Sequence, residues 1–318
     1  MDKKISFVIP AKDEEKSIEQ LYEEIISSVL PITKDIEIIF IDDGSKDGTF
    51  DTMSSLARRD ERVKVIKLRG NFGKSIALTV GFENSRGKII ITLDGDLQDD
   101  PKEIPKFIKK IEEGYDLVSG WKKKRKDPIT KTIPSIVVNF LTAAMSGLKI
   151  HDVNCGFKAY KRSVVENLHL YGDLYRFIPI LASRQNFKIA EIAINHRKRK
   201  FGSSKYGFGR FISGWLDLLT LFFITRYLRR PGHFFGTIGL LSLSIGFVIG
   251  LYITYLKITT GGIAYRQPLL SLGILLIILG VQLLTTGLFA EMIIFFQKKE
   301  DHQKFIVERV NFTKKYPT

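Results

Sequence analysis

The chain has 318 residues, of which 26% are charged and 44% hydrophobic, and its formal net charge is +15. This length allows one large domain, or one domain with a smaller part attached. The single cysteine, Cys155, excludes an internal disulfide and fits a reducing compartment, so we interpret it as a packed small residue and not as a nucleophile. The chain is basic but shows no nucleic-acid-binding motif, so we expect no nucleic acid among its partners.

The N-terminal part alternates between short apolar runs and helical patterns. Runs rich in β-branched and aromatic residues predict strands at 5–9, 36–41, 63–68 and 89–93. Between the first two, residues 17–30 carry one apolar helical face, made of Ile18, Leu21, Ile25 and Val29. Repeated strand–helix–strand units with nearly continuous apolar strands predict an α/β fold with a mostly parallel sheet of the nucleotide-binding type.

A further helix is predicted at residues 101–114. Pro101 is tolerated in a first helical turn, and Gly114 stands where a helix commonly ends. Its apolar face consists of Ile104, Phe107, Ile108 and Ile111.

Acidic, turn-forming residues follow three of the predicted strands, in the segments 10–15, 42–49 and 94–101. Because ligands bind beyond the carboxyl ends of the strands in such sheets, this edge is the expected place of a site. The segment D-G-D-L-Q-D-D-P crowds four carboxylates together, those of Asp94, Asp96, Asp99 and Asp100. Such crowding requires positive charge nearby, either from basic side chains or from a metal ion.

The sequence favours the metal ion. No predicted strand is followed by a glycine-rich phosphate loop of the form G-x-G-x-x-G or G-x-x-x-x-G-K-[ST], so the diphosphate of a nucleotide would need another counter-charge. We therefore expect Asp94 and Asp96 to hold a divalent cation. Their oxygen atoms suit Mg²⁺ or Mn²⁺.

Two long segments without a charged residue lie at 234–256 and 267–290. As helices, each would span roughly 35 Å at about 1.5 Å per residue, enough to cross the hydrocarbon core of a bilayer. A pair of buried core helices is the alternative, but such helices usually keep a polar face. We expect two transmembrane helices.

Basic residues around these segments predict their orientation. They are Arg226, Arg229 and Arg230 before the first segment and Lys298 and Lys299 after the second, with only Lys257 and Arg266 between the two. By the positive-inside rule, both termini lie in the cytosol and the short loop lies outside. The N-terminal apolar run is too short for a secretory signal, so we expect the N-terminal domain to stay on the cytosolic face of the cell (inner) membrane.

Four motifs in order, P-A-K-D-E, D-D-G-S-x-D-G-T, G-N-F-G-K and D-G-D-L-Q-D-D-P, resemble glycosyltransferase family 2, which has the GT-A fold. More narrowly they resemble polyprenyl-phosphate glycosyltransferases such as dolichyl-phosphate mannose synthase and bactoprenol glucosyl transferase. The resemblance covers residues 5 to about 210, and the two apolar segments match the bactoprenol type. The expected parts are a cytosolic GT-A domain (1–205), amphipathic juxtamembrane helices (206–231), transmembrane helices (232–257 and 268–296), an outer loop (258–267) and a cytosolic tail (297–318).

The resemblance implies roles at the donor site. Asp43 matches a residue that reads the base, and Gln98 stands where a glutamine joins the metal shell of the mannose synthases. Asp13 stands where the family usually has Asn. The implied donor-binding residues are Pro10, Ala11, Asp13, Glu14, Asp43, Gly73, Lys74, Asp94, Gly95 and Asp96, and the implied metal ligands are Asp94, Asp96 and Gln98.

The resemblance also implies an acceptor site. Residues 151–162 resemble a D-x-x-S-G-F-R segment, with Cys155 in place of Ser and Lys158 in place of Arg, and make Asp152 a candidate catalytic residue beside Asp94 and Asp96. Residues 196–207 match R-x-x-G-x-S-K-Y, which implies that Arg199, Ser204, Lys205 and Tyr206 bind the acceptor phosphate. Such a basic run could instead bind anionic lipid non-specifically. The Phe- and Leu-rich segment after it favours an acceptor site held at the headgroups by an interfacial helix.

The implied reaction is the metal-dependent, inverting transfer of a sugar to a polyisoprenyl phosphate such as undecaprenyl phosphate. A lipid phosphate is already an anion and needs no general base. UDP-glucose is the first choice of donor, and GDP-mannose or a UDP-linked modified sugar are the alternatives.

Other interpretations are less consistent with the sequence. A processive polysaccharide synthase would carry a Q-x-x-R-W motif, which is absent. A membrane-anchored nucleotide-binding scaffold without catalysis would not need intact D-x-D and R-x-x-G-x-S-K-Y motifs. Two uncharged spans cannot by themselves form the polar path of a transporter. Glycines at 236, 239, 246 and 250 permit close helix packing and thus a homo-oligomer. The tail contains one apolar run, F-I-V, to which the sequence assigns no role; docking on the catalytic domain and docking on a neighbouring subunit are both open.

Overall fold

The structure, a computed structural model, describes residues 4–123, 150–168, 170, 172–197, 231–263, 265–296 and 306–311. The chain divides into two units, Met1–Leu221 together with Asp301–Thr318, and Phe222–Glu300. We call them the catalytic unit and the hairpin unit. The juxtamembrane segment expected at 206–231 lies outside the described residues except for Pro231.

The catalytic unit is built on one sheet. Its described strands are β1 (Ile5–Ala11), β2 (Ile36–Asp42), β3 (Val63–Leu68), β4 (Ile89–Thr92), β5 (Leu117–Trp121), β6 (Lys158–Lys161), β7 (Ile189–Ala193) and β8 (Ile306–Val310). They lie in the order β7-β5-β6-β4-β1-β2-β3-β8. The pairs β4–β1, β1–β2, β2–β3 and β5–β7 are parallel, whereas β6 and β8 run antiparallel to their neighbours. The four predicted strands and the mostly parallel sheet are confirmed.

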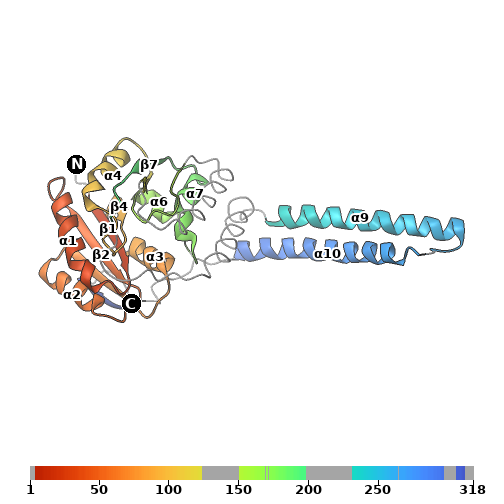
Figure 1. Cartoon of the computed structure of the whole chain (residues 1–318), viewed down its shortest axis with the longest axis horizontal. Coiled ribbons are helices and arrows are strands. Elements are labelled where there is room, and N and C mark those ends of the chain that lie inside the picture. Colours follow the sequence, from red (N-terminus) through yellow and green to blue (C-terminus); the bar gives the residue numbers. More distant parts are fainter. Residues whose placement is uncertain are drawn as a thin grey trace. The chain divides into compact units, whose positions relative to one another are not determined.

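Helices cover both faces of this sheet (Figure 1). The described ones are α1 (Glu15–Val29), α2 (Thr49–Arg59), α3 (Lys74–Asn84), α4 (Ile104–Glu112), α6 (Arg162–Glu166) and α7 (Ile178–Ser183), with 3₁₀ turns η1 (Pro101–Glu103) and η2 (Leu174–Phe177). Alternate residues of β1 point to opposite faces. Ile5, Phe7 and Ile9 join the core under α1, α2 and α4. Val8 faces α3, where a Cβ added at Gly81 would lie 2.3 Å from its Cγ1 atom.

The first predicted helix is confirmed, and the second begins later than predicted. α1 buries the four predicted apolar residues and Ser17. Residues 101–103 form η1, and α4 begins only at Ile104. The reason is Pro105, which lacks the N–H group that would bond to the carbonyl of Pro101 in an α-helix. Gly114 follows the helix with φ of 103°, in agreement with its expected role at the end.

The C-terminal tail supplies the edge strand β8. It pairs antiparallel with β3, with Val310 opposite Val65 and Arg309 opposite Ile66. The side-chain Nδ2 of Asn311 donates to the backbone carbonyl of Val63 at 3.1 Å and also to that of Ala57. Ile306 and Val307 of the F-I-V run therefore belong to the sheet of the catalytic unit.

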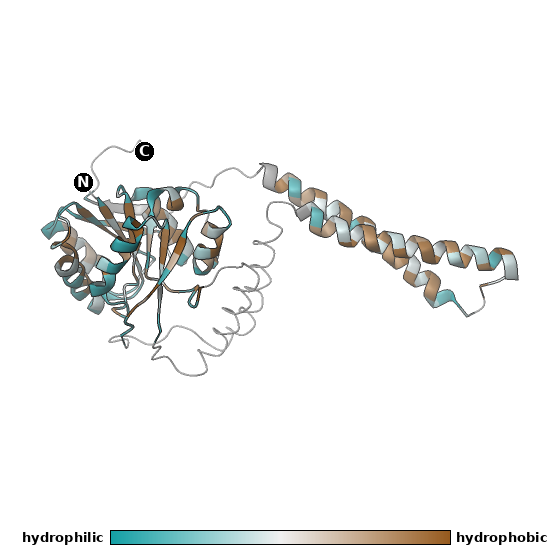
Figure 2. Cartoon of the chain, turned by 90° about the horizontal axis from the view of Figure 1, so that it is seen from above, coloured by the Kyte–Doolittle hydropathy of each residue, from teal (hydrophilic) through white to brown (hydrophobic). Residues whose placement is uncertain are grey.

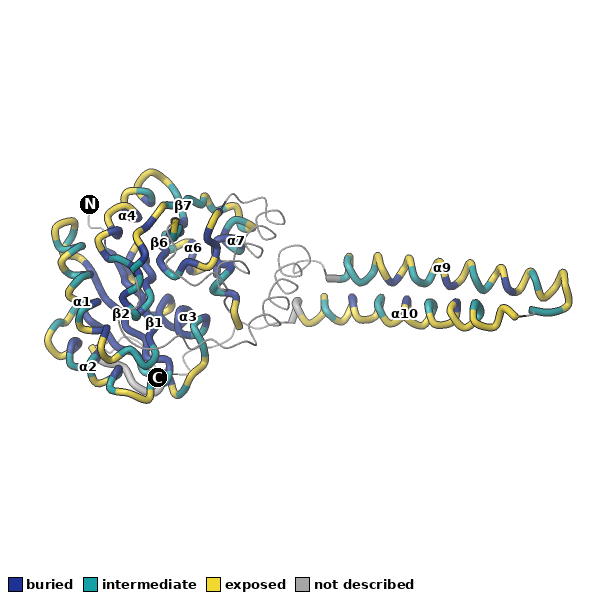
Figure 3. The backbone as a smooth tube through the Cα atoms, viewed as in Figure 1, coloured by how far each residue is buried: buried dark blue, intermediate teal, exposed yellow. Residues whose placement is uncertain are grey.

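The hairpin unit consists of α9 (Pro231–Thr260) and α10 (Gln267–Phe296). Residues 232–260 and 267–293 are long and apolar enough to cross a membrane. Most of their large apolar side chains are exposed, unlike the strands of the catalytic unit (Figures 2 and 3). This exposure contradicts the alternative of buried core helices and makes both helices candidate membrane spans.

Glycines allow α9 and α10 to pack closely. A Cβ at Gly239 would lie 2.8 Å from the carbonyl oxygen of Gly280, and one at Gly246 would lie 2.6 Å from that of Gly273. Gly250, by contrast, has no atom within 4 Å of its added Cβ. Gly239 and Gly246, which were considered for contacts between chains, therefore pack against α10 of the same chain. Oligomerisation stays a prediction.

Candidate active site

The loops after β1 and β2 are joined by hydrogen bonds. The backbone N–H of Asp13 donates to Ser45 Oγ at 3.0 Å, and that of Lys46 donates to Asp13 Oδ1 at 2.7 Å. The N–H of Glu14 donates to Thr49 Oγ1 at 2.8 Å. Asp13 has φ of 50°, a left-handed conformation that Asp and Asn adopt more readily than most residues. The predicted donor-binding residues Asp13 and Glu14 therefore lie where two loops at the sheet edge are joined by hydrogen bonds.

Asp43 organises the G-N-F-G-K loop. Its carboxylate accepts hydrogen bonds from the N–H groups of Phe72 at 2.8 Å and Gly73 at 3.0 Å. Burial raises the pKa of Asp43 above its usual value, although these two hydrogen bonds oppose the shift. Gly73 has φ of 87°, which favours glycine at this turn. The structure thus brings Asp43 and Gly73 together as predicted, and a role of Asp43 in reading the base stays a prediction.

The segment after β4 alternates between accessible and buried residues. Asp94, Asp96 and Gln98 are partly exposed, whereas Gly95 and Leu97 between them are buried. Leu97 packs into the core with φ of 60°, an uncommon value for a bulky residue. The backbone thus turns so that the three predicted metal ligands remain accessible.

These side chains fit a divalent cation. Two carboxylates and an amide oxygen are hard donors, and Mg²⁺ or Mn²⁺ commonly takes one or two protein carboxylates together with substrate phosphates. Among the described residues, no group of three or more His, Cys, Asp or Glu side chains could hold a metal ion. Because Mg²⁺ has an octahedral shell, a cation held by Asp94, Asp96 and Gln98 would keep coordination positions for a diphosphate.

Basic side chains also neutralise this acidic segment. The prediction that a metal ion alone supplies the counter-charge was therefore incomplete. Lys74 of α3 forms an ion pair with Asp94. Lys122 forms another with the buried Asp99, with 3.3 Å between Nζ and Oδ1. Burial alone would raise the pKa of Asp94, but the ammonium groups of Lys74 and Lys122 lower it. Burial would likewise lower the pKa of Lys122, but Asp99 and other anionic groups raise it.

Lys122 is a site residue that the sequence did not indicate, because it belongs to a run of lysines that resembles an ordinary surface loop. Only its neighbours in space distinguish it. Its side chain is 16% exposed, although it directly follows the edge of β5 at Trp121. A lysine immediately after a buried strand is the one signal that could have marked it.

The segment from Asp152 to Lys158 lies beside Asp94. A Cβ added at Gly156 would lie 2.6 Å from Asp94 Oδ2, so the backbone of Gly156 packs directly on that carboxylate. Asp152 is buried, and its N–H donates to Glu191 Oε1 at 2.9 Å. Lys122 and Lys158 both interact electrostatically with Asp152.

Cys155 and Lys158 occupy the positions where the chain departs from the family pattern. Burial raises the pKa of Cys155 to about 12, which keeps it a thiol and agrees with a packed small residue. Burial lowers the pKa of Lys158 to about 8. The ammonium group of Lys158 donates to the carbonyl of Cys155. The two substitutions are therefore in contact with each other.

The remaining predicted donor residues lie where β1 meets the acidic segment. Pro10 and Ala11 end β1. A Cβ at Gly95 would lie 2.9 Å from that of Ala11, and Ser17 Oγ donates to the carbonyl of Gly95 at 2.7 Å. The predicted acceptor residues Arg199, Ser204, Lys205 and Tyr206 lie outside the described residues.

Comparisons with known proteins agree with this geometry. A family model described as glycosyl transferase family 2 matches residues 6–168. The dodecaprenyl-phosphate galacturonate synthase of Rhizobium johnstonii is 37% identical over 294 residues, which cover 91% of this chain and 87% of that protein. The undecaprenyl-phosphate 4-deoxy-4-formamido-L-arabinose transferase of Shewanella sediminis is 36% identical over 293 residues, covering 91% and 86%.

A solved structure supports the fold. The glucosyl-3-phosphoglycerate synthase of Mycobacterium tuberculosis, in complex with Mn²⁺, UDP and its product, has a TM-score of 0.53 at 20% identity over 70% of this chain and 80% of that one. The chain belongs to glycosyltransferase family 2, as predicted, and to its polyprenyl-phosphate group, in which a sugar is transferred to a polyprenyl phosphate.

Proposed function

We propose that this chain transfers a sugar, most simply glucose from UDP-glucose, to undecaprenyl phosphate with inversion at the anomeric carbon. The observation that carries the proposal is the accessible trio Asp94, Asp96 and Gln98 at the carboxyl end of β4. These residues lie at the edge of the GT-A sheet where we expect the sugar donor to bind, in a chain with two candidate membrane spans.

The proposed reaction is a single displacement. A phosphate oxygen of the lipid attacks the anomeric carbon, the bond from that carbon to the diphosphate oxygen breaks, and UDP leaves. A divalent cation, Mg²⁺ or Mn²⁺, held by Asp94, Asp96 and Gln98 would neutralise the departing diphosphate. Because the attacking phosphate is already ionised, no side chain has to remove a proton.

The protein residues then have to position two anions that repel each other. Asp43 fixes the G-N-F-G-K loop beside the donor edge through two backbone hydrogen bonds. Lys74 lies on Asp94, where it can also face a diphosphate. We assign the acceptor phosphate to Arg199, Ser204, Lys205 and Tyr206, and we assign the orientation of that acceptor to Asp152.

The position of β8 supports cytosolic termini on an inner membrane. β8 follows α10 in the chain but pairs with β3 of the catalytic unit. If α9 and α10 each cross a membrane once, the chain returns to the side on which it started, as the pairing of β8 with β3 requires. In a Gly262→Cys variant, we expect labelling by a membrane-impermeant thiol reagent from outside the cell, because the single native Cys155 is buried.

The sugar is the least constrained part of the proposal. Galacturonate is a second candidate because a relative 37% identical is named for it. The formamido-arabinose of another relative and the mannose of GDP-mannose are further donors to compare. An uncharged hexose needs no counter-charge of its own, and among the described residues Lys74 and Lys122 already have the carboxylate partners Asp94 and Asp99.

The test uses purified protein in detergent with undecaprenyl phosphate, Mn²⁺ and labelled UDP-glucose. We expect label in the organic phase, and a loss of about 1,000-fold in Asp96→Ala, which removes the firmest metal ligand. Asp51→Ala, at an exposed position of α2, serves as the matched control and should retain full activity. Transfer from UDP-galacturonate or GDP-mannose alone would keep the reaction and replace the sugar. Metal-dependent UDP binding without transfer from any donor would favour the inactive scaffold.

A further inference from the structure

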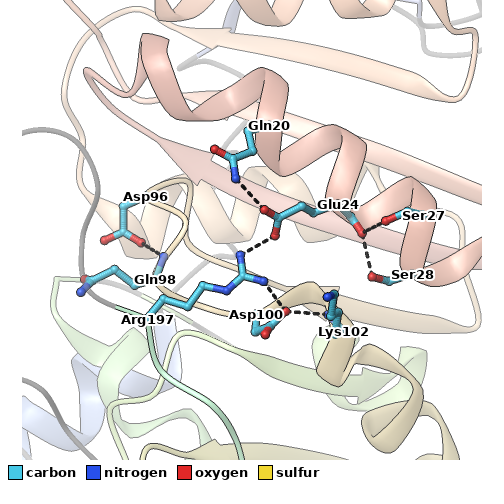
Figure 4. Close-up of polar contacts among 9 residues, drawn as sticks. All are labelled: Gln20, Glu24, Ser27, Ser28, Asp96, Gln98, Asp100, Lys102 and Arg197. Atoms are coloured by element: carbon cyan, nitrogen blue, oxygen red, sulfur yellow. Dashed lines mark hydrogen bonds and ion pairs between the residues drawn. The ribbon is translucent and has the colours of Figure 1, made fainter.

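One polar side chain of the hairpin unit has no partner within that unit. Gln282 lies near the middle of α10, roughly 20 Å from either end at about 1.5 Å per residue, and it is exposed. Among the described residues, none forms a hydrogen bond with its side-chain amide. A glutamine of the catalytic unit differs: Gln20 of α1 donates to Glu24 Oε1 at 2.7 Å, one helical turn away (Figure 4). The amide of Gln282 is thus satisfied neither by α10 nor by α9.

The hydroxyl groups beside Gln282 do not need an outside partner. Thr285 Oγ1 donates to the carbonyl of Val281 at 3.0 Å and to that of Gln282 at 2.9 Å. Thr286 Oγ1 donates to the carbonyl of Gln282 at 2.8 Å. Both hydroxyls are bonded to the backbone of their own helix. Of these three polar side chains, that of Gln282 is the one left to be satisfied.

The side of α10 that packs on α9 lies opposite to Gln282. A Cβ added at Gly239 of α9 would lie 2.8 Å from the carbonyl oxygen of Gly280 and 3.1 Å from Leu284 Cγ. Gly280 and Leu284 each stand two residues from Gln282, and two residues correspond to about 200° around an α-helix. Gln282 therefore points away from α9. If α10 spans a membrane, this direction leads into the hydrocarbon core.

Gln282 belongs to a stripe of exposed residues on this outer side of α10. The stripe repeats at alternating intervals of three and four residues, which is the spacing of a coiled-coil seam. Its members are Leu275, Ile278, Gln282, Thr285, Phe289 and Met292. In such a seam, one polar residue among apolar ones can fix the register in which helices associate. The outer side of α10 therefore has the pattern of a helix–helix contact surface with a central amide.

A second copy of this chain meets the requirement of that amide. An amide without hydrogen bonds is costly in hydrocarbon. A lipid phosphate cannot supply them, because the headgroups lie roughly 15 Å from the centre of the bilayer. A copy in the same membrane has the same orientation, so its Gln282 lies at the same depth. Since a glutamine amide carries both donors and an acceptor, identical amides can satisfy each other.

We propose that the outer side of α10 binds α10 of a second copy of this chain, with the Gln282 amides of the two copies hydrogen-bonded to each other. The inference rests on α9 and α10 as membrane spans and is independent of the sugar and of the acceptor lipid. The two helices run parallel, so each residue of the stripe lies near the same residue of the other copy, as Thr285 does.

The first experiment measures self-association of the full chain in lipid bilayers, by energy transfer between labelled copies at a series of protein-to-lipid ratios. In Gln282→Leu, which removes the amide at nearly constant volume, we expect the dissociation constant to rise about tenfold. Gln282→Asn keeps an amide and should retain part of the affinity. Thr286→Val is the matched control and should equal the wild type, because the hydroxyl that it removes is already bonded within α10.

The second experiment tests the contact surface by cysteine cross-linking under mild oxidation. We expect Thr285→Cys to link two copies, and to do so much less when Gln282→Leu is added. Leu241→Cys on α9, where the native side chain is 62% exposed, is the control and should not link copies. The native Cys155 is buried in the catalytic unit and should not contribute.

Three results would overturn the inference. The first is a wild type that stays monomeric at every protein-to-lipid ratio. The second is cross-linking of Thr285→Cys that does not change when Gln282→Leu is added. The third is equal cross-linking of Thr285→Cys and Leu241→Cys, which would indicate random collisions. If contacts between catalytic units also hold the copies together, the dissociation constant changes less, and the loss of cross-linking on adding Gln282→Leu decides the role of the amide.

Discussion

The catalytic unit and the hairpin unit both bring separate chain segments into close contact, but with opposite chemistry. At the acidic turn, charge packs on charge, as in the ion pairs of Lys74 with Asp94 and of Lys122 with Asp99. In the hairpin, backbone packs on backbone, and Gly239 and Gly246 contact the carbonyls of the opposite helix.

This difference corresponds to two tasks, the binding of a charged ligand and the close packing of two helices. Ion pairs are directional and can exchange partners when another charge arrives, as a site that binds a diphosphate requires. Glycine contacts carry no charge and set only the distance between two helices. The site should therefore respond to small shifts of its charges, and the hairpin should respond to added volume.

Among the changes that test this comparison, the largest effect is expected from adding one methyl group beside a charged side chain. In Gly156→Ala, the new Cβ would lie 2.6 Å from Asp94 Oδ2 and has to displace that carboxylate. We expect transfer to fall by about 100-fold, because a displacement of about 1 Å at a reacting centre can cost that much. Gly250→Ala of α9, outside the site, is the control, since nothing lies within 4 Å of its added Cβ. Full activity of Gly156→Ala would show that Asp94 tolerates displacement and that charge position matters less than we infer.

The packing of the hairpin should instead be destabilised by added side-chain volume. In Gly239→Ile, the side chain meets the carbonyl of Gly280, so we expect the helices to separate at a cost of about 1–3 kcal/mol. Gly250→Ile on the same helix meets nothing within 4 Å and should be neutral. Thermal unfolding in detergent measures both. Equal effects of the two changes would contradict specific packing at Gly239.

A buried lysine makes the stability of the catalytic unit depend on pH. The folded pKa of Lys158 is lowered to about 8 from an ordinary 10.5, because burial penalises its charge. Between these values the unfolded chain binds more protons than the folded one, so this residue makes the free energy of unfolding rise with pH. Relative to Lys158→Met, the wild type should gain on the order of 1–3 kcal/mol from pH 8 to 10.5. A constant difference in denaturant midpoint between the two proteins would contradict the shift.

The smallest expected effect concerns the edge strand. Asn311→Ala removes the donors to Val63 and Ala57 that fix the end of β8. We expect a loss of about 1 kcal/mol in the free energy of unfolding, the net value of a typical hydrogen bond. Hydrogen exchange at the backbone of β3 should report it first. Unchanged protection of β3 in this variant would indicate that β8 is held by its ladder alone.

Much of the fold could be predicted because its signal is local. Fully buried parallel strands are continuous apolar runs, and the two candidate membrane spans are longer ones, so both were visible in the sequence. The start of α4 was wrong by one turn because the missing N–H of Pro105 outweighed the helix signal of Pro101. β8 was not predicted as a strand, because its sequence is short and its pairing partner β3 is far away in the chain.

The motifs predicted which residues gather at the candidate site, and their roles there stay predictions. The motifs indicated Asp43, Asp94 and Asp96, and the structure places these residues at one edge of the sheet. The lysines that balance them come from separate segments, and no local pattern shows that Lys122 will meet Asp99. Gly156 was part of a motif, but its contact with Asp94 depends on the packing of β6 against β4.

The position of β8 also sets the order in which the protein is assembled. Both apolar helices leave the ribosome before the strand that completes the sheet, because β8 follows α10 in the chain. Until then β3 is an open edge, with a row of backbone groups available to other chains. If α9 and α10 span a membrane, the final strand can reach that edge only after the hairpin has returned the chain to the starting side. Closure of the sheet would then depend on the insertion of both preceding helices.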